Sequence, residues 1–400
     1  MIVLEPIDKS VAKILWYGDA CSNTGFARVT HSVLDRLKDD HEIVVYGINY
    51  TGDPHDYPFK IYPTCSGGSS DRFGIGRIPE ILDREKPDVI ICLNDLWILN
   101  QFWERCQFMK QQQDFKFVAY FPVDSEWYYQ DMLKNIPHWD LAVTFTEGSA
   151  RRILRHKIEN TEIGILPHGV DTGKFYPIDK NEARGRLGLP TDKFIVLNAN
   201  RNQPRKRIDL TIQAFAEFAV DKPDTVLYLH MGVKDMGWDV MPLFKREMEK
   251  RGLDGSKRLI LTSENLNYLA APPDEFLNDI YNACDVGINT AEGEGWGLVS
   301  FEHASCKKPQ VVPNHTACKD IWEEAGLLAD IATWVTEKDL GAERGLVDTS
   351  HAAQLLTDLY TDKELYNEIS ETCYAVTQRS EYRWESVAKA FSKAVTELAE

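Results

Sequence analysis

The sequence predicts an α/β protein with two Rossmann-like parallel-sheet domains that face each other across a cleft. Short apolar runs typical of buried strands alternate with amphipathic, helix-like stretches through most of the 400 residues, a pattern that favours doubly wound parallel sheets. The alternation is interrupted at 167–177 and then starts again. We therefore expect an N-terminal domain at 1–172, a C-terminal domain at 173–378, and a terminal helix at 379–400 that packs back toward the N-terminal domain.

In the first half, six apolar runs predict the strands of one sheet. They lie at 12–17, 43–46, 89–93, 117–121, 141–145 and 163–166. Phe26 and Val29 begin a stretch with helical spacing, so the loop 18–25 leads from the first strand into a helix. Ligands bind at such loops in open parallel sheets. Gly25 would let the backbone approach a ligand, although a glycine here often serves turn geometry alone.

The second half repeats this organisation. Its apolar runs predict strands at 194–198, 226–230, 259–261, 286–288 and 310–312. Helical spacing predicts helices at 208–220, 241–251 and 276–283, and closing helices at 355–360, 365–376 and 384–398. Two sheets of this kind leave a cleft where the carboxyl ends of their strands face each other.

Composition limits the class of protein. With 43% hydrophobic and 27% charged residues, the chain is an ordinary globular sequence with sizeable cores. The net charge of -17 disfavours broad binding to nucleic acid or anionic membranes. The start lacks a basic region followed by an apolar core, and no run approaches a membrane span of about 18 apolar residues. We expect a soluble, cytoplasmic protein whose eight cysteines are reduced and mostly buried.

A glycine-rich loop at 293–297 lies between a predicted strand and a predicted helix that starts near Leu298. Its glycines allow close backbone approach, and the first amides of the helix have no intrahelical acceptors, so the loop can hold an anion. Glu294 and Glu302 frame this site and would accept hydrogen bonds from sugar hydroxyls. Taken singly, each glutamate is more often a solvated surface residue. The apolar neighbours of Glu302 favour a buried carboxylate, which needs a partner.

Four cations follow the first strand of the second half: Arg201, Arg205, Lys206 and Arg207. At the carboxyl end of a parallel strand they would face the cleft, where Arg can bind two phosphate oxygens and Lys supplies a mobile charge. We favour Arg201 and Lys206 as phosphate ligands because of where the loop leaves the strand. Arg205 and Arg207 are interpreted as a solvated charge run.

The loop 122–129 is aromatic and acidic, and it follows a predicted strand of the first half. Two roles for Asp124 stay open here. It either contacts a ligand at the carboxyl end of the sheet or caps a helix in a packed loop.

At this point the sequence resembles the family-four retaining glycosyltransferases of the GT-B fold. The resemblance covers most of the chain and rests on three motifs. These are Glu294 and Glu302 with seven residues between them, the pair Arg201 and Lys206, and the junction 167–177. Together the motifs are specific, whereas each alone is a modest signal.

The resemblance implies that a nucleoside diphosphate sugar, UDP- or GDP-linked, binds chiefly to the second domain. Arg201 and Lys206 would contact the diphosphate, Glu302 the ribose hydroxyls and Glu294 the hydroxyls of the donor sugar. Gly25 would close over the diphosphate from the first domain. The backbone amides that would face the phosphate or sugar are those of Trp296, Gly297, Leu298 and Val299.

Two further expectations concern the chemistry. The chain has no Asp-x-Asp triplet, which suits a metal-independent mechanism without a cofactor, in which protein cations stabilise the departing diphosphate. Relatives commonly carry a histidine near the sugar in a first-domain loop. Asp124 is the candidate substitute here, either to orient the donor sugar or to accept a proton from the acceptor.

We therefore predict a retaining, metal-independent hexosyltransferase that moves a sugar from a nucleoside diphosphate to an acceptor hydroxyl. One alternative is a non-catalytic sugar-nucleotide-binding or scaffold protein of the same fold. A nicotinamide-dependent dehydrogenase is disfavoured because neither glycine loop reads Gly-x-Gly-x-x-Gly.

The acceptor stays open among a glycan, a lipid-linked sugar, a small metabolite, a protein and a modified nucleic-acid base. The loop 127–129 and the turn 65–70 are first-domain features that an acceptor could contact. The basic stretch 151–157 is expected to form a helix that either docks an anionic surface or faces water.

Overall fold

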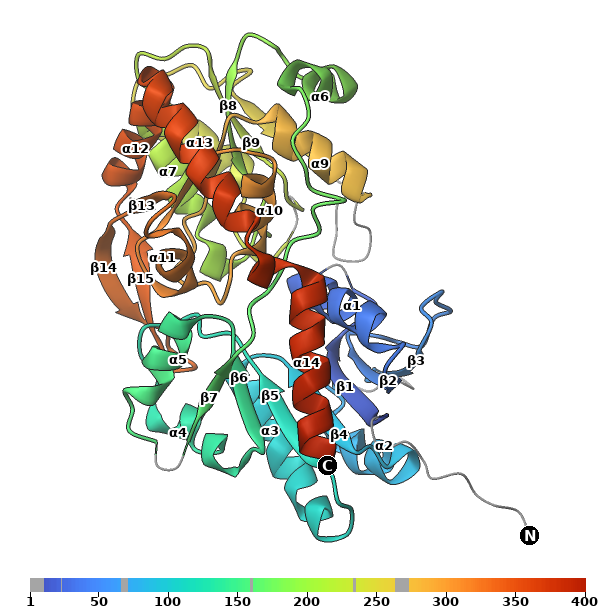
Figure 1. The fold of residues 1–400 in the computed structure, drawn as a ribbon. Coiled ribbons are helices and arrows are strands. Elements are labelled where there is room, and N and C mark those ends of the chain that lie inside the picture. Colours follow the sequence, from blue (N-terminus) through green and yellow to red (C-terminus); the bar gives the residue numbers. More distant parts are fainter. Residues whose placement is uncertain (1–10, 23, 66–70, 159–160, 233–234, 263–272) are drawn as a thin grey trace, which may run out of the picture.

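The computed structural model describes residues 11–22, 24–65, 71–158, 161–232, 235–262 and 273–400. They form two α/β domains, one above the other in Figure 1, each with a parallel sheet and packed helices. The expected fold class is therefore confirmed. The long helix α14 (Trp384–Ala399) descends from the second domain and lies against the first (Figure 1).

The first domain contains a seven-stranded sheet in the order β3-β2-β1-β4-β5-β6-β7. Its strands are β1 (Lys13–Asp19), β2 (Glu42–Ile48), β3 (Lys60–Pro63), β4 (Val89–Leu93), β5 (Lys116–Tyr120), β6 (Leu141–Thr144) and β7 (Ile163–Ile165). Its helices are α1 (Gly25–Leu37), α2 (Ile78–Glu85), α3 (Leu96–Cys106), α4 (Gln130–Leu133) and α5 (Glu147–Leu154), with 3-10 turns η1 (Ile75–Arg77), η2 (Gln107–Gln111) and η3 (Ile136–His138). The sequence did not predict β3, a four-residue edge strand with a single buried residue.

The second domain contains a six-stranded sheet in the order β10-β9-β8-β11-β12-β13. Its strands are β8 (Phe194–Asn198), β9 (Thr225–Leu229), β10 (Leu259–Leu261), β11 (Val286–Ile288), β12 (Gln310–Pro313) and β13 (Leu327–Ala329). Its helices are α6 (Lys180–Leu187), α7 (Ile208–Phe218), α8 (Val240–Glu249), α9 (Asp274–Ala283), α10 (Leu298–Ser305), α11 (Thr316–Trp322), α12 (Thr349–Thr361) and α13 (Lys363–Thr377), with 3-10 turns η4 (Pro204–Lys206) and η5 (Ser380–Tyr382).

Strand order reverses at one point in each sheet. β1 lies between β2 and β4, and β8 lies between β9 and β11, and all of these pairs are parallel. The connections leave such a strand pair in opposite directions, so a crevice opens at the carboxyl ends of the strands. The loops after β1, β4, β8 and β11 therefore meet between the domains.

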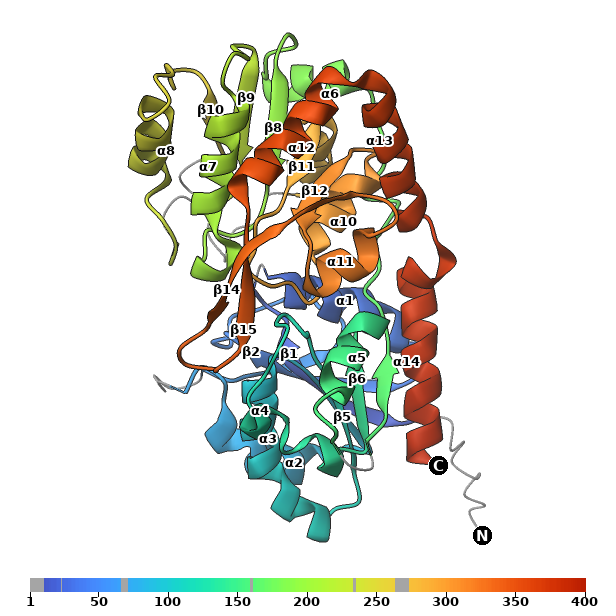
Figure 2. The ribbon, with the colours of Figure 1, turned by 90° about the vertical axis from the view of Figure 1, so that its left-hand side faces the viewer.

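A two-stranded hairpin that the sequence did not predict joins the domains. Figure 2 shows β14 (Ile331–Thr336) and β15 (Glu343–Val347) extending from the second domain toward the first. The amide of Glu126 donates to the carbonyl of Glu343, and the amide of Glu343 donates to the carbonyl of Trp127, both at 2.9 Å. Gly341 has φ +59° and meets the ring of Tyr129, which leaves no room for a side chain. The hairpin thus holds the aromatic loop 127–129.

Helix α14 anchors the end of the chain on the first domain. Its Phe391 packs on Trp16 of β1 with ring centroids 6.0 Å apart. Glu385 of the same helix accepts a hydrogen bond from the Arg36 guanidinium of α1 at 2.6 Å. These contacts connect the two domains in addition to the hairpin and the junction near 167–177.

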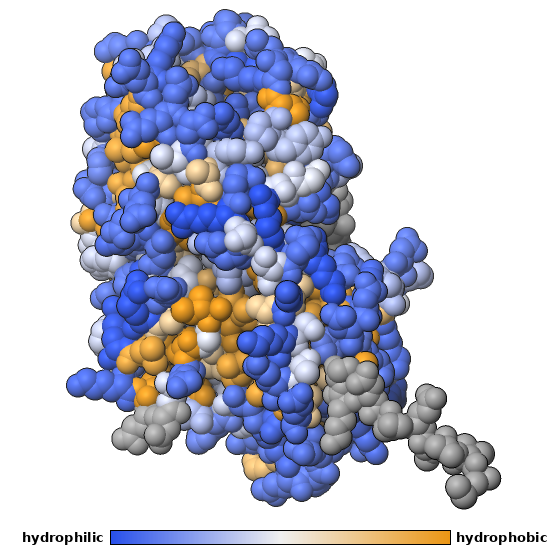
Figure 3. All heavy atoms as spheres, viewed as in Figure 1, coloured by the Kyte–Doolittle hydropathy of each residue, from blue (hydrophilic) through white to orange (hydrophobic). Residues whose placement is uncertain are grey.

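Polar side chains cover most of the face in Figure 3, and hydrophobic ones gather on the first domain in the region of α5, β6 and β7. Leu154 and Ile165, on α5 and β7, are 42% and 43% exposed. None of the eight cysteines, all of them in the described part of the chain, forms a disulfide, and six are buried. Within the described ranges, no helix combines the length and apolarity that crossing a bilayer requires.

Candidate active site

A cavity of about 420 Å³ lies between the domains at the crevice of both sheets. Nine of the ten predicted site residues line it: Gly25, Asp124, Arg201, Lys206, Glu294, Trp296, Gly297, Leu298 and Val299. The exception is Glu302. Residues as far apart in the sequence as Gly25 and Val299 therefore line one cavity.

The glycine loop approaches the first domain so closely that side chains would not fit. A Cβ on Gly293 would overlap the carbonyl of Asp124, and a Cβ on Gly295 would overlap Pro122. Gly297 has φ +88° and precedes the first turn of α10. On the opposite wall, a Cβ on Gly25 would lie 3.3 Å from Leu298. These glycines let two backbone loops and the start of α10 converge on the cavity.

The centre of the cavity wall is a buried ion pair. Lys206 Nζ lies 2.5 Å from Glu294 Oε1, and Asn289 donates to the same oxygen at 3.1 Å. Burial favours a raised pKa for the Glu294 carboxyl, but Lys206 and Arg205 outweigh it and hold the pKa below its usual value. Burial lowers the pKa of Lys206, and Glu294 opposes that effect. The pair is stable as two charges only while both partners are present.

Arg205 lies in the cavity, which contradicts its interpretation as a solvated charge. Its guanidinium contacts Glu294 Oε2 at 3.4 Å and Asp124 Oδ2 at 3.6 Å, and it also donates to the Gly293 carbonyl. The reason is η4, a 3-10 turn that directs both Arg205 and Lys206 into the cleft. Arg207 instead pairs with Asp209 outside the cavity.

Arg201 lines the cavity but is engaged by an acidic partner. Its Nε and Nη2 atoms donate to the two carboxylate oxygens of Asp235, each at 3.1 Å. This is the forked geometry with which Arg binds carboxylate or phosphate. A phosphate at this point would have to share or displace Asp235.

Glu302 lies in the interface between the domains, outside the cavity wall. Arg28 of α1 contacts it at 3.2 Å, and Tyr281 donates to its other oxygen at 2.9 Å. The same Arg28 contacts Asp274 at 2.9 Å. Burial raises the pKa of Glu302, and Arg28 opposes this shift. The predicted ribose contact of Glu302 therefore requires Arg28 to move or to share the carboxylate.

Asp124 lies on the cavity wall, where cations surround its carboxylate. Arg205 and Arg344 lie 3.6 and 3.5 Å from its Oδ2, and Tyr128 donates to its Oδ1 at 3.4 Å. Burial favours a raised pKa, but Arg344 and Arg205 hold the pKa of Asp124 below its usual value. A carboxylate in this state is a weak base. Asp124 is therefore better suited to orient a sugar than to accept a proton.

Arg344 and Asp95 are among the residues of the site that were not predicted from the sequence. Arg344 comes from the hairpin β14–β15 and is buried, and its Nε atom has no hydrogen-bond partner among the described residues. Asp95 follows β4 and lines the cavity. Burial, together with Asp124, raises the pKa of Asp95 to about 6. An acidic residue directly after a buried strand was a usable signal for Asp95, whereas nothing in the local sequence indicated Arg344.

The cavity contains an imidazole, although not from the loop where relatives carry one. His168, in the junction between the domains, lines the cavity among Phe145, Trp296 and other rings. Neither of its ring nitrogens has a hydrogen-bond partner among the residues that the structure describes. Burial lowers its pKa to about 3. The ring is therefore neutral near pH 7 and can donate one hydrogen bond and accept another.

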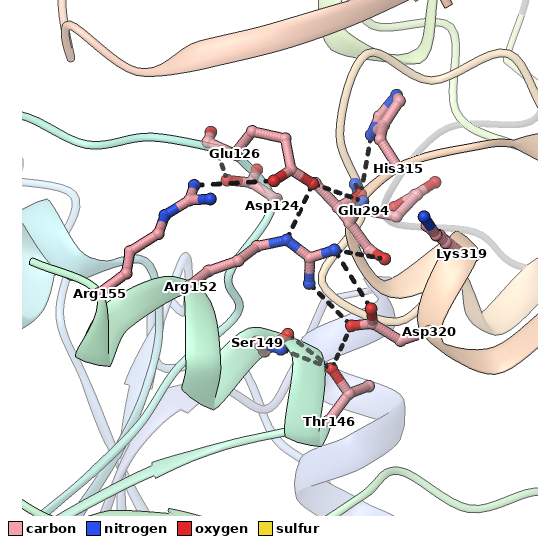
Figure 4. A network of polar contacts seen from close by, with 12 residues as sticks. Asp124, Glu126, Thr146, Ser149, Arg152, Arg155, Glu294, His315, Lys319 and Asp320 are labelled. Carbon is pink, nitrogen blue, oxygen red and sulfur yellow. Dashed lines mark hydrogen bonds and ion pairs between the residues drawn. The ribbon is translucent and has the colours of Figure 1, made fainter. Parts of the chain in front are cut away.

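A second polar network holds the domains together beside the cavity (Figure 4). Arg152 of α5 donates to both carboxylate oxygens of Asp320 on α11, at 2.8 and 3.1 Å, and to Glu126 at 2.9 Å. Glu126 also accepts from the Thr316 amide at 3.1 Å, and the Thr316 hydroxyl accepts from the Glu294 amide at 3.2 Å. The network therefore extends from the domain interface to the site.

This network also includes arginines of the basic stretch 151–157. Arg152 is buried against the second domain, and Arg155 lies 3.6 Å from Glu126 and over the ring of Trp127. Arg151 is exposed. The stretch 151–157 therefore uses two of its arginines within the protein, which weakens the hypothesis that it docks an anionic surface.

Comparison with known proteins identifies the second domain most directly. Residues 179–374 match the family described as Glycosyl transferases group 1. A D-inositol 3-phosphate glycosyltransferase from Acidothermus cellulolyticus is 32% identical over 199 residues, which cover 48% of this chain and 42% of that relative. A relative of the same description from Nocardioides sp. is 35% identical over 177 residues, 43% of this chain and 38% of its own length. These matches span less than half of either relative.

Solved structures resemble the whole chain. The sucrose-phosphate synthase from Thermosynechococcus elongatus superposes with a TM-score of 0.76 at 15% identity, over 97% of this chain and 99% of that one. Anabaena HepE, solved in complex with UDP-glucose, gives a TM-score of 0.71 at 15% identity, over 96% of this chain and all of its own. At this identity the likeness shows the fold alone. The second domain, residues 179–374, therefore belongs to the family of Glycosyl transferases group 1, and the chain as a whole has the GT-B fold.

Proposed function

We propose that the protein is a retaining glycosyltransferase that moves a hexose from a nucleoside diphosphate, UDP- or GDP-linked, to an acceptor hydroxyl. One observation carries the proposal. Lys206 and Arg205 lie beside the first turn of α10 in one interdomain cavity, together with the carboxylates of Glu294 and Asp124. Cations and helix amides suit a diphosphate, and carboxylates suit sugar hydroxyls. The family of the second domain and the UDP-glucose complex of a neighbour of the same fold support this choice.

The reaction breaks the bond between the sugar C1 atom and the diphosphate oxygen and forms a bond from C1 to the acceptor oxygen. On a front-face route, the acceptor proton passes to the departing phosphate oxygen. Negative charge grows on the diphosphate in the transition state, so Lys206, Arg205 and the amides of α10 stabilise that state more than the bound donor. These fixed groups supply the countercharge in the metal-independent mechanism that we propose.

Asp95, Asp124 and His168 would act on hydroxyl groups. Asp124 stays ionised between two arginines and can accept hydrogen bonds from the donor sugar. His168 is neutral and can donate to the sugar. Asp95, whose pKa is raised to about 6, is mostly ionised at pH 7.5 and accepts a hydrogen bond from a hydroxyl.

Release of nucleotide from a donor tests this function against a non-catalytic binding protein. Purified protein is incubated in EDTA with UDP-glucose, UDP-N-acetylglucosamine or GDP-mannose, and UDP or GDP is quantified by chromatography. We expect slow release from one donor with water alone, because transferases hydrolyse a donor when no acceptor competes. Lys206→Met should abolish this release, and Lys245→Met, on the exposed face of α8, should not. Binding without release from any of these donors would instead support the non-catalytic alternative.

A further inference from the structure

A larger groove adjoins the donor cavity on the side of the first domain. Its volume is about 1040 Å³, and it shares Thr24, Arg201 and Gln203 with the donor cavity. Its other lining residues are Cys21, Asn49, Tyr50, Thr51, Asp53, Pro54, His55, Asp56, Tyr57, Cys65, Arg72, Asp235 and Met236. The groove is therefore formed mainly by the loop after β2 and opens directly onto the place proposed for the diphosphate. Of the turn 65–70, Cys65 lines the groove, and 66–70 lie outside the described residues.

The floor of this groove carries an ordered group of aromatic rings. Tyr57 stacks on His31 with ring centroids 4.0 Å apart and an interplanar angle of 13°. His31 is itself fixed, since its Nε2 atom lies 2.5 Å from the Ala20 carbonyl oxygen at the end of β1. His55 lies 5.6 Å from Tyr57. Tyr57 remains 40% exposed although its ring stacks on His31. An exposed ring held in one orientation is a platform for a flat ligand face.

The charges around the platform disfavour an anionic ligand. Asp53, Asp56 and Asp235 line the groove against two guanidiniums, and one of these, Arg201, is already bound by Asp235. The other cation among the described lining residues, Arg72, donates to Asn49 at 3.1 Å. A polyanion would meet the carboxylates of Asp53 and Asp56, which form no ion pair with another described residue, and nucleic-acid binding relies on clustered cations. Hydroxyl groups, in contrast, can donate to the carboxylates and accept from Arg72.

We propose that this groove binds the acceptor, and that the acceptor is a neutral saccharide that rests one ring face on Tyr57. The proposal rests on the proposed function, since it places the acceptor hydroxyl next to the donor. The C–H groups on one face of a sugar ring carry partial positive charge and pack on the negative face of an aromatic ring. The groove volume lies at the upper end for ligand sites, so it holds more than one sugar ring.

Saturation-transfer difference NMR tests the ligand class directly. The probes are maltose, cellobiose, glucose 6-phosphate and a short DNA duplex, each added to wild-type protein. We expect a neutral disaccharide to bind and to receive saturation mainly on the C–H protons of one ring face. Tyr57→Ala should weaken this binding at least about tenfold, while Tyr57→Phe keeps it within about twofold because the ring remains. Phe108→Ala, an exposed ring on η2, is the control for general surface effects.

Two NMR results would contradict a neutral saccharide on Tyr57. Preferred binding of glucose 6-phosphate or DNA over both disaccharides would overturn the proposal, as would unchanged disaccharide binding in a folded Tyr57→Ala protein. If Tyr57→Ala does not fold, the pattern of saturated protons on wild-type protein decides the question. Saturation spread evenly over both ring faces would count against stacking.

A kinetic test separates this proposal from the proposed function. Nucleotide release from the productive donor is measured with and without each probe. Faster release with a neutral disaccharide supports both the transferase function and the acceptor groove, provided that Tyr57→Ala changes the two KM values differently. The KM for the acceptor should rise at least about tenfold in this variant, and the KM for the donor should stay within about twofold. Acceleration only by glucose 6-phosphate or DNA overturns the acceptor class and leaves the transferase standing. If no donor releases its nucleotide, the proposed transferase function is refuted. The NMR experiment then tests only whether the groove binds a neutral saccharide.

Discussion

The donor cavity and the proposed acceptor groove meet at Arg201, but they hold their polar groups differently. In the cavity, Lys206 and Glu294 are buried and paired, with 13% and 5% of their side chains exposed. In the groove, the platform residue Tyr57 is 40% exposed, and Asp56 faces solvent. Charges fixed in a site of low dielectric constant act strongly on a diphosphate. Exposed rings and hydroxyl acceptors suit a neutral, variable ligand.

Removal of Lys206 should give the largest effect, because it affects both the stability and the chemistry of the cavity. Lys206→Met leaves the Glu294 carboxylate buried without its closest cation. We expect the free energy of unfolding to fall by about 3 to 5 kcal/mol and sugar transfer to fall at least about 100-fold. Urea unfolding and nucleotide release measure the two losses.

A double variant separates the two losses. Lys206→Met combined with Glu294→Gln removes both charges and keeps their volume, so most of the stability should return. Transfer should stay low, since neither the countercharge nor the sugar contact is restored. Recovery of transfer along with stability would show that the pair is structural only.

Arg205→Lys should have the next largest effect. The substitution keeps a positive charge but loses the fork that contacts Glu294, Asp124 and the Gly293 carbonyl. We expect kcat to fall about 100-fold. Arg207→Lys is the matched control, because Arg207 pairs with Asp209 outside the cavity. Equal losses in the two variants would contradict the distinction between them.

The fall in transfer activity on the acid side of the pH profile, the acid limb, should follow the protonation of Asp95. Its pKa is raised to about 6, so transfer should fall as the pH drops below about 6 and the carboxylate becomes a poorer acceptor. Asp95→Asn should lose this limb and lower kcat/KM about tenfold or more. Arg344→Met should move the limb to higher pH, because the Arg344 charge lowers the pKa of Asp95. A pH profile that is the same in all three proteins would exclude Asp95.

The same residue should limit stability. When folding raises the pKa of a carboxyl, the protonated carboxyl stabilises the folded protein. This contribution is complete below the pKa of the unfolded state and disappears as the pH rises through the pKa of the folded state. For Asp95 this window runs from about pH 4 to about pH 6. At pH 7.5 we therefore expect Asp95→Asn to be about 1 to 2 kcal/mol more stable than wild type, after allowance for solvent screening. Urea unfolding at pH 7.5 and pH 4 would show this gap and its closure.

A pair of glycine substitutions tests the interface that shapes the cavity, through stability alone. A Cβ on Gly148 would overlap the carboxylate of Asp320, which Arg152 holds, whereas a Cβ on Gly185 meets nothing within 4 Å. Gly148→Ala should lower the free energy of unfolding by about 1 to 3 kcal/mol and open the domains, seen as a larger radius of gyration. Gly185→Ala should raise it by about 0.5 to 1 kcal/mol. The reverse order would contradict the tight interface.

The sequence predicted the two sheets because each strand run is apolar and short, so β4, β8, β10 and β11 have the predicted bounds. It missed β14 and β15, where residues such as Trp334 are exposed in the structure. That hairpin contacts the first domain through the bridge between Trp127 and Glu343. Such a contact is not visible in local sequence.

Candidate residues were recognised where a single loop contains recognisable chemistry and missed where tertiary contacts create it. Lys206 was expected at the diphosphate and Glu294 at the donor sugar, and their side chains, from two different loops, lie 2.5 Å apart. Arg205 was misjudged because a run of cations is usually solvated, and only the geometry of η4 turns it inward. The pairing of Glu302 with Arg28 joins helices from different domains. Burial against a distant partner cannot be deduced from spacing within one segment.

Isothermal titration calorimetry with UDP and with GDP in EDTA tests our claim that Lys206 and Arg205 bind a nucleoside diphosphate between the domains. We predict that one of the two nucleotides binds the wild-type protein. The stabilised double variant, Lys206→Met with Glu294→Gln, should bind it about ten- to a hundredfold more weakly, because a hydrogen bond to a charged group is lost. Equal affinity in the two proteins, or no binding of either nucleotide to the wild type, would contradict the claim.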